Sequence, residues 1–272
     1  MLEIFLNPFI FRALIAIILI SVISATIGNL IFYRGESFLL VGSAHAAMAG
    51  AALVMVLSSY LLLRINPLVG ALIFSVLIVI PYLIEREKKT FEELESFLGL
   101  IFAFTLAAAV FFISLLREYA TQAWGLIIGD ILLLTTSDVI LLMILSALSV
   151  LVVLTFIREL LYISFDVESS LIIYPKSKIF EYLFGIALAA GVVVLLKSVG
   201  ALLIYIFTIA PASVANRISN DAYRAMFLTF IISVTVGILS ILIGVLFNIP
   251  PSTLAGLILA LMYIAIELVR RK

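Results

Sequence analysis

The chain has 272 residues, of which 65% are hydrophobic and 12% charged, and its formal net charge at pH 7 is zero. Soluble domains are roughly 45–50% apolar and about 25% charged, so this composition excludes a water-soluble fold and a disordered chain. The neutral balance gives no indication of a nucleic-acid partner. The lack of cysteine excludes disulfides and thiolate metal sites.

Long apolar runs separated by charge, proline or glycine predict helices that cross a membrane, because about 20 apolar residues span the hydrocarbon core. We expect nine spans, at residues 11–33, 39–63, 67–84, 97–116, 139–157, 179–196, 199–215, 222–246 and 250–268. The boundary between the sixth and seventh rests only on Lys197, Ser198 and Gly200, so eight spans is the alternative. The run 125–134 is too short to cross and is predicted to be re-entrant or interfacial.

These runs predict the fold class: an all-α polytopic membrane protein with one transmembrane domain over residues 1–272. The orientation follows from the basic residues, which concentrate on the cytoplasmic side of membrane proteins. With nine spans and the N-terminus outside, 12 of the 16 Lys and Arg residues fall in or beside cytoplasmic loops. We therefore expect an outside N-terminus and a cytoplasmic C-terminus, with Glu267 paired with Arg270 at the membrane interface.

Two connectors on the expected cytoplasmic side are rich in charge. Residues 85–95 predict a charged helix on the membrane surface. Residues 158–178 form the longest inside loop, which combines charged residues with apolar ones such as Leu160, Tyr162 and Phe165. Such a loop fits a helix lying on lipid headgroups or a docking site for a cytoplasmic partner, and composition alone does not separate the two.

The second span is unusual in its small side chains. Nine of the eleven residues from 42 to 52 are glycine, alanine or serine, and small residues let membrane helices approach closely. His45 and Met48 are the exceptions and share a helix face. An imidazole inside a membrane helix marks a functional site by default, although His45 could also act as packing glue by donating a hydrogen bond to a neighbouring helix. Met48 is expected to fill the core.

The sequence contains no motif for a catalytic site. The Walker A and His-Glu-x-x-His patterns are absent, so neither nucleotide hydrolysis nor zinc-protease chemistry is predicted. Gly129-Asp130 matches only part of the motif of intramembrane aspartyl proteases, because Ile127 replaces a required glycine. Asp138, after Thr135, is predicted to cap a helix start. We expect no catalytic residue and no permanently bound cofactor, so the chain is not predicted to be an enzyme.

Several motifs, in order and spacing, resemble the ABC-3 metal permeases, the membrane subunits of ABC transporters for zinc, manganese and iron. The segments that carry the resemblance are AHAAMAG at 44–50, WGLIIGD at 124–130, RELLYISFD at 158–166, VGALL at 199–203 and FNIP at 247–250. Pro8, Arg12, Gly28 and Arg34 resemble the family's first span, and Pro211-Ala212 its later Pro-Ala motif. The resemblance covers nearly the whole chain.

The resemblance implies the permease subunit of an ATP-driven importer in a prokaryotic cell membrane. It implies a homodimer in membrane lipid, two cytoplasmic ATPase subunits that bind the ATP, an extracellular substrate-binding protein, and a divalent metal ion as transported substrate. The loop at about 158–178 would carry the family's coupling helix at 166–171, which sits in a cleft of the ATPase. The residues that would make this contact are Glu159, Phe165, Asp166, Glu168 and Leu171.

The resemblance makes His45 the candidate metal ligand. The family usually places an Asp four residues before this His, so that carboxylate and imidazole share a helix face, and Val41 occupies that position here. The alternatives are the same permease fold carrying a chelated metal or a non-metal substrate, and a membrane carrier outside the ABC class. The scarcity of charge within the spans argues against an ion-coupled carrier.

Overall fold

A computed structural model describes residues 7–61, 65–86, 88–116, 125–129, 131–174 and 176–270. These residues form an all-helical structure without strands. The helices are α2 (Pro8–Ile23), α3 (Asn29–Arg34), α4 (Ser37–Leu61), α5 (Pro67–Arg86), α6 (Phe91–Ser114), α8 (Thr136–Thr155), α9 (Ile157–Phe165), α10 (Val167–Ile173), α11 (Ser177–Val199), α12 (Ile204–Ile218), α13 (Ala222–Phe247) and α14 (Pro251–Arg270). A π-helical turn, η1 (Ser24–Gly28), joins α2 to α3, and a short 3₁₀ turn, η2 (Ile131–Leu133), precedes α8.

Eight helices of the described residues are long and apolar enough to cross a membrane, which confirms the polytopic helical fold. The continuous helix α2–η1–α3 is the first of them, followed by α4, α5, α6, α8, α11, α13 and α14. The break predicted at Gly200 is confirmed, since α11 ends at Val199. The remaining predicted span is α12, whose 15 residues extend only about 22 Å, less than the ~30 Å hydrocarbon core.

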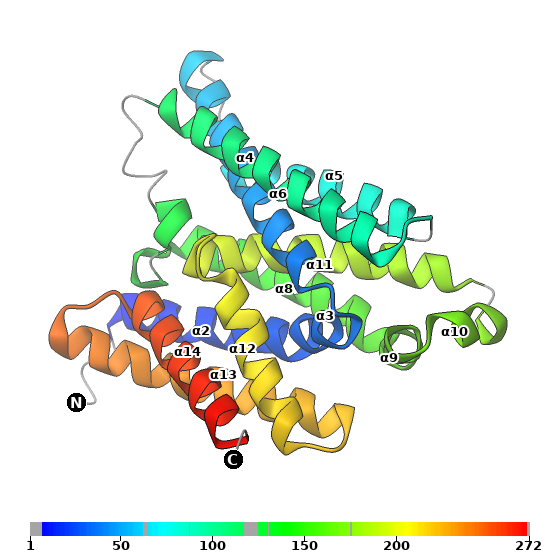
Figure 1. Cartoon of the computed structure of the whole chain (residues 1–272). Helices are drawn as coiled ribbons and strands as arrows, with labels where there is room; N and C mark the ends of the chain where they lie inside the picture. Colours follow the sequence, from blue (N-terminus) through cyan, green and yellow to red (C-terminus); the bar gives the residue numbers. More distant parts are fainter. Residues whose placement is uncertain are drawn as a thin grey trace.

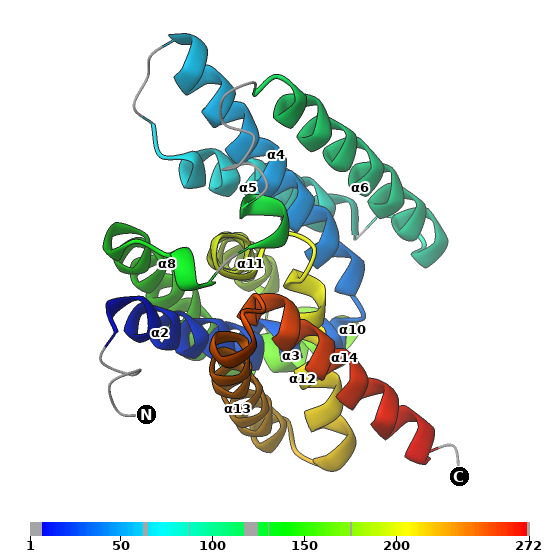
Figure 2. The same ribbon diagram turned by 90° about the vertical axis from the view of Figure 1, so that its left-hand side faces the viewer.

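The helices pack in three groups, which Figures 1 and 2 show from two directions. Helices α4, α5 and α6 form one layer, α2, α8 and α11 run side by side next to it, and α12, α13 and α14 cover the opposite side. Helices α4 and α11 are the most buried of the candidate spans. The α9–α10 segment and the α5–α6 connection lie at the same end of the molecule, on the right in Figure 1.

The small residues of α4 explain its burial. Gly50 of α4 and Gly70 of α5 face each other so closely that a Cβ atom on either would collide with the carbonyl oxygen of the other. Only glycine lets two helix backbones touch in this way. The prediction that the second span packs closely against its neighbours is therefore confirmed at the crossing of α4 and α5.

The first membrane helix and α12 are both irregular where they meet. Pro211 lies inside α12 and has no amide hydrogen, so the carbonyl of Phe207, four residues earlier, receives no bond from residue 211. The buried hydroxyl of Ser24, in the π-helical turn, donates to that carbonyl at 2.9 Å. A side chain from one helix thus supplies the donor that proline removes from another, as backbone irregularities inside a membrane require.

The predicted re-entrant run is held by main-chain hydrogen bonds. Residues 125–128 are helical, and the backbone amides of Ala201 and Leu202 donate to the carbonyls of Leu126 and Ile127, at 3.0 and 3.3 Å. Gly129 has a positive φ of 68° and presses directly on the backbone around Gly200. Asp130 lies outside the described residues.

The expectation of a separate surface helix at 85–95 is wrong. Helix α5 continues to Arg86, and α6 begins at Phe91 and runs directly into its span. The physical reason is a capping box: the Thr90 hydroxyl accepts from the Glu93 amide, and the Glu93 carboxylate accepts from the Thr90 amide. This reciprocal cap starts a helix at the turn itself. Glu92, Glu93 and Glu95 therefore belong to the first turns of α6, whereas Glu85 and Arg86 end α5.

Candidate functional site

His45 lies in the middle of α4 and is 7% exposed. Its Nδ1 atom lies 2.9 Å from the carbonyl oxygen of Val41. A carbonyl can only accept, so Nδ1 carries the hydrogen, and in the neutral imidazole the free electron pair is on Nε2. Metal-binding histidines commonly donate their second ring nitrogen to a backbone carbonyl in this way. The local geometry thus leaves Nε2 as a potential ligand atom.

The surroundings of His45 are mainly apolar. The ring of Phe102 in α6 contacts it edge to face, with ring centroids 4.9 Å apart, and Met48 is buried one turn further along α4. Within the described residues, no group of three or more His, Asp or Glu side chains is placed to hold a metal ion. No hydrogen bond joins His45 to another helix among these residues, so the structure gives no support to the packing-glue interpretation.

Helices α9 and α10, joined at Asp166, form a bent segment that we call the elbow (residues 157–173). Asp166 caps α10 by accepting a hydrogen bond from the Ser169 amide at 2.9 Å. The predicted coupling helix 166–171 thus corresponds to α10. Phe165 is 65% exposed and Ile172 is 83% exposed. The side chains of Glu168 and Leu171 lie outside the described ones.

A groove of 380 Å³ runs along the elbow. It is lined by Arg158, Leu161, Tyr162, Phe165, Asp166 and Tyr223. Tyr223 comes from the first turn of α13, so the groove joins two elements that are distant in sequence. Of the predicted coupling residues, Phe165 and Asp166 line this groove, and Glu159 lies in the first turn of α9.

A second charged region, which sequence reasoning missed, lies beneath the elbow. Arg86, at the end of α5, places Nε 3.0 Å from a carboxylate oxygen of Glu36 and Nη1 2.9 Å from one of Glu181 in α11. Arg34 ends α3 and donates from Nε to the Ser164 hydroxyl of α9 at 3.0 Å. We call Arg34, Glu36, Arg86 and Glu181 the inner charge cluster. The sequence signal that could have found this cluster is that each of its two glutamates and two arginines lies close to the end of an apolar helix.

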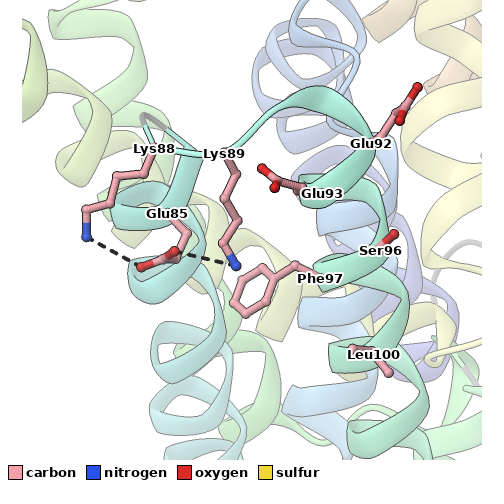
Figure 3. Close-up of a pocket in the computed structure, with 8 residues that line it drawn as sticks. All are labelled: Glu85, Lys88, Lys89, Glu92, Glu93, Ser96, Phe97 and Leu100. Carbon is pink, nitrogen blue, oxygen red and sulfur yellow. Dashed lines mark ion pairs between the residues drawn. The ribbon is translucent and has the colours of Figure 1, made fainter.

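The α5–α6 connection carries a shallow groove of 700 Å³, shown in Figure 3. Lys88 and Lys89 each lie 3.5 Å from Glu85, and the Lys89 ammonium sits over the Phe97 ring. Glu93 is occupied by the cap of α6. Because most of these charges already have partners within the groove, it does not offer a cluster of free carboxylates for a cation.

The remaining predicted polar contacts are structural. Asp138 completes a capping box with Thr135 at the start of α8, as predicted, and also lies 3.4 Å from Lys197. Glu267 forms an ion pair with Arg217 of α12. The side chain of Arg270, its predicted partner, lies outside the described ones.

The described residues thus form a polytopic helical membrane protein with an exposed elbow at one end. Comparison with known proteins places it: the profile of the ABC 3 transport family matches residues 7–270, and the chain belongs to this family. It is 28% identical over 258 residues to the manganese import system permease protein ScaB of Streptococcus gordonii, covering 94% of this chain and 89% of that protein.

Two further similarities agree. The chain is 25% identical to the high-affinity zinc uptake system membrane protein ZnuB of Haemophilus influenzae, over 90% of each protein. A chain in the structure of PsaBC from Streptococcus pneumoniae in complex with Fab has the same fold, with a TM-score of 0.83 and 24% identity, over 97% of this chain and 95% of that one. The family is therefore that of metal ABC transporter permeases, as the sequence motifs indicated.

Proposed function

We propose that this chain is the transmembrane permease subunit of an ATP-driven importer for a divalent metal ion, such as manganese, zinc or iron. In this proposal the whole chain is one permease domain that pairs with a second copy. Two cytoplasmic ATPase subunits bind and hydrolyse the ATP, and an extracellular protein delivers the ion. The N-terminus lies outside and the C-terminus in the cytoplasm of a prokaryotic cell. This orientation requires a ninth crossing, which α12 makes together with the turn at residues 201–203 that precedes it. Family membership, together with the exposed elbow, supports this proposal.

The elbow has the properties of a docking element. Phe165, Ile172 and Ile173 expose large apolar side chains at the end of the molecule where the α5–α6 connection also lies (Figure 1), which we expect to be cytoplasmic. Exposed apolar side chains next to charged ones mark interaction surfaces. Because α9 continues from α8 and α10 leads into α11, a partner that moves the elbow moves two membrane helices. Closing of the two ATPase subunits would produce a rigid-body motion of this kind, which would open the ion path first to one side of the membrane and then to the other.

The docking step is tested by co-purification. The chain is co-expressed with its candidate ATPase, and Ile172 and Ile173 are both replaced by Asp. The control replaces Leu246 and Phe247 by Asp, which puts the same two charges on exposed residues in the last turn of α13. That turn lies at the other end of α13 from Tyr223, which lines the groove along the elbow. We expect the elbow variant to lose the ATPase and the control to keep it. Equal recovery of the ATPase with all three proteins would contradict docking at the elbow.

His45 is the proposed ligand for the ion, with Nε2 as the donor atom. His45→Ala should reduce uptake of manganese or zinc into cells at least about tenfold, because one lost ligand weakens a metal site strongly. The ATPase should still co-purify. The control is Met48→Leu, which changes the buried neighbour of His45 on the same helix face but keeps a side chain of similar size and apolar character. This variant should transport normally.

A second candidate, transport of a chelated metal or a non-metal, is favoured by one observation: Val41 replaces the expected carboxylate, and no cluster of ligands surrounds His45 in the described part. Val41→Asp separates the two candidates. If the substrate is a free ion, the new carboxylate one turn before His45 should lower the concentration needed for half-maximal uptake. Unchanged uptake in both His45→Ala and Val41→Asp would favour the second candidate.

A further inference from the structure

The inner charge cluster joins four elements beneath the elbow. Glu36, at the start of α4, is 4% exposed, and Glu181 of α11 is 8% exposed. Both carboxylates are held by the single guanidinium of Arg86 from α5. Buried charges are retained only where they are paired, and two arginines with two glutamates make the cluster neutral as a whole.

Arg34 is the member whose pairing is incomplete. Its Nε donates to the Ser164 hydroxyl, and its guanidinium lies 4.3 Å from the centre of the Phe184 ring. Nη1 and Nη2 are buried and have no hydrogen-bond partner within the described structure. A buried donor without an acceptor costs free energy, so the position of Arg34 is not the one that its donors alone would favour.

Glu36 has acceptor capacity to spare in the same cluster. Its buried carboxylate contacts Arg86 as an ion pair and interacts with the buried Tyr82 hydroxyl, but neither of its oxygens has a well-aligned hydrogen bond among the described residues. The charges of Glu36 and Glu181 act on Arg34. These carboxylates are the alternative partners in the cluster for its unpaired donors, and bonds from a guanidinium to a carboxylate are about twice as strong as neutral ones.

We propose that Arg34 is a positioning residue that changes partner during transport. In the present conformation it is held by Ser164 of the elbow. When the elbow moves, Arg34 leaves Ser164 and donates to Glu36, while Arg86 keeps Glu181. Because Glu36 immediately precedes α4, this exchange passes the movement of the elbow to the helix that carries His45. The inference rests on the proposed function, since it needs an ATPase that moves the elbow.

The exchange has the form of a two-state switch rather than a gradual deformation. Both arrangements keep all four charges inside the protein and neutral as a set, and each glutamate has an arginine partner in both of them. They differ in whether Arg34 bonds to a hydroxyl on the elbow or to a carboxylate at the start of α4. The proposal thus assigns two discrete arrangements to the inner charge cluster, and elements of that kind couple distant sites physically.

The test uses the complete complex with its ATPase, reconstituted in lipid vesicles, and measures ions transported per ATP hydrolysed. Ser164→Ala removes only the hydroxyl that holds Arg34, and Arg34→Gln removes the charge that is exchanged. We expect both variants to hydrolyse ATP while transporting at least about fivefold fewer ions per ATP, with Arg34→Lys recovering part of the loss because it keeps the charge. The ATPase should co-purify with all of them.

The matched control is Ser149→Ala, which removes another buried serine hydroxyl with a bond between helices, to the Ala187 carbonyl at 2.8 Å, away from the inner charge cluster. It should keep the normal ratio of ions to ATP. If Arg34→Gln does not fold, Ser164→Ala decides alone. A normal ratio in Ser164→Ala and in any folded Arg34→Gln would overturn the partner exchange. Failure of the unmodified chain to bind any ATPase would instead overturn the proposed function.

Discussion

The hydrogen bond from Ser24 to the Phe207 carbonyl, four residues before Pro211 in α12, provides a sharp test of how this fold tolerates broken helices. Ser24→Ala removes the donor to the Phe207 carbonyl, which lies in the buried seam between η1 and α12. In the natural chain, the amide of residue 211 cannot replace that donor, because proline has none. Pro211→Ala restores an amide at that position and makes the hydroxyl of Ser24 dispensable.

The size of the effect follows from the environment of the carbonyl. Hydrogen bonds between membrane helices contribute about 0.6 kcal/mol on average and up to about 1.7 kcal/mol, and leaving a buried acceptor unpaired costs about 1–3 kcal/mol. Ser24→Ala should therefore lower the free energy of unfolding by about 1–2 kcal/mol. In the Pro211→Ala background the same substitution should cost only a few tenths of a kcal/mol, so the two sites couple by about 1 kcal/mol.

The measurement is a double-mutant cycle on protein purified in detergent, with unfolding by added sodium dodecyl sulfate followed by far-UV circular dichroism. Ser198→Ala is the control, because its equally buried hydroxyl bonds to the Val194 carbonyl of its own helix at 2.8 Å. That carbonyl already accepts a backbone bond, so little stability should be lost. The reasoning is refuted if Ser24→Ala costs the same whether residue 211 is Pro or Ala.

Two further substitutions test the close packing of the structure. Gly50→Ala should destabilise the protein by about 1–3 kcal/mol, because its Cβ meets the Gly70 carbonyl. The control is Gly99→Ala in α6, where open space surrounds the glycine, and it should be neutral or stabilising by up to about 1 kcal/mol. The same unfolding assay compares the two variants. Equal effects of Gly50→Ala and Gly99→Ala would contradict the close approach of α4 and α5. Ser252→Ala removes a buried donor to the Gly129 carbonyl at 3.1 Å and should cost about 1 kcal/mol, whereas Ser252→Thr should cost less; equal losses would show that the hydroxyl does not hold this segment.

The membrane helices could be predicted from sequence because their signal is local. Apolar runs with charged or proline boundaries identify spans one at a time, and eight of the nine predicted spans are long enough to cross. The shortness of α12 was harder to predict from sequence. Its start depends on the turn after Gly200, which is set by main-chain bonds to the re-entrant segment at Leu126 and Ile127, and a pairing between segments about 75 residues apart leaves no local pattern.

The site was predictable only where one helix carries it. His45 stands out in a span of small residues, and its bond to Val41 stays within α4. The inner charge cluster escaped prediction because its members come from α3, the start of α4, α5 and α11. In the sequence each of them looks like an ordinary charge at the end of an apolar helix, and the positive-inside rule accounts for Arg34 and Arg86 without any cluster. Only packing shows that they meet.

Polar groups are distributed unevenly along the proposed transport direction. At mid-span, the described residues supply one imidazole and no carboxylate cluster, whereas two arginines and two glutamates meet beneath the elbow. A path needs sites weak enough for the ion to leave, and a single imidazole meets that condition. Under the proposed function, selectivity for the ion would then rest mainly with the protein that delivers it. The permease would contribute the timing, through the charges that link the elbow to α4.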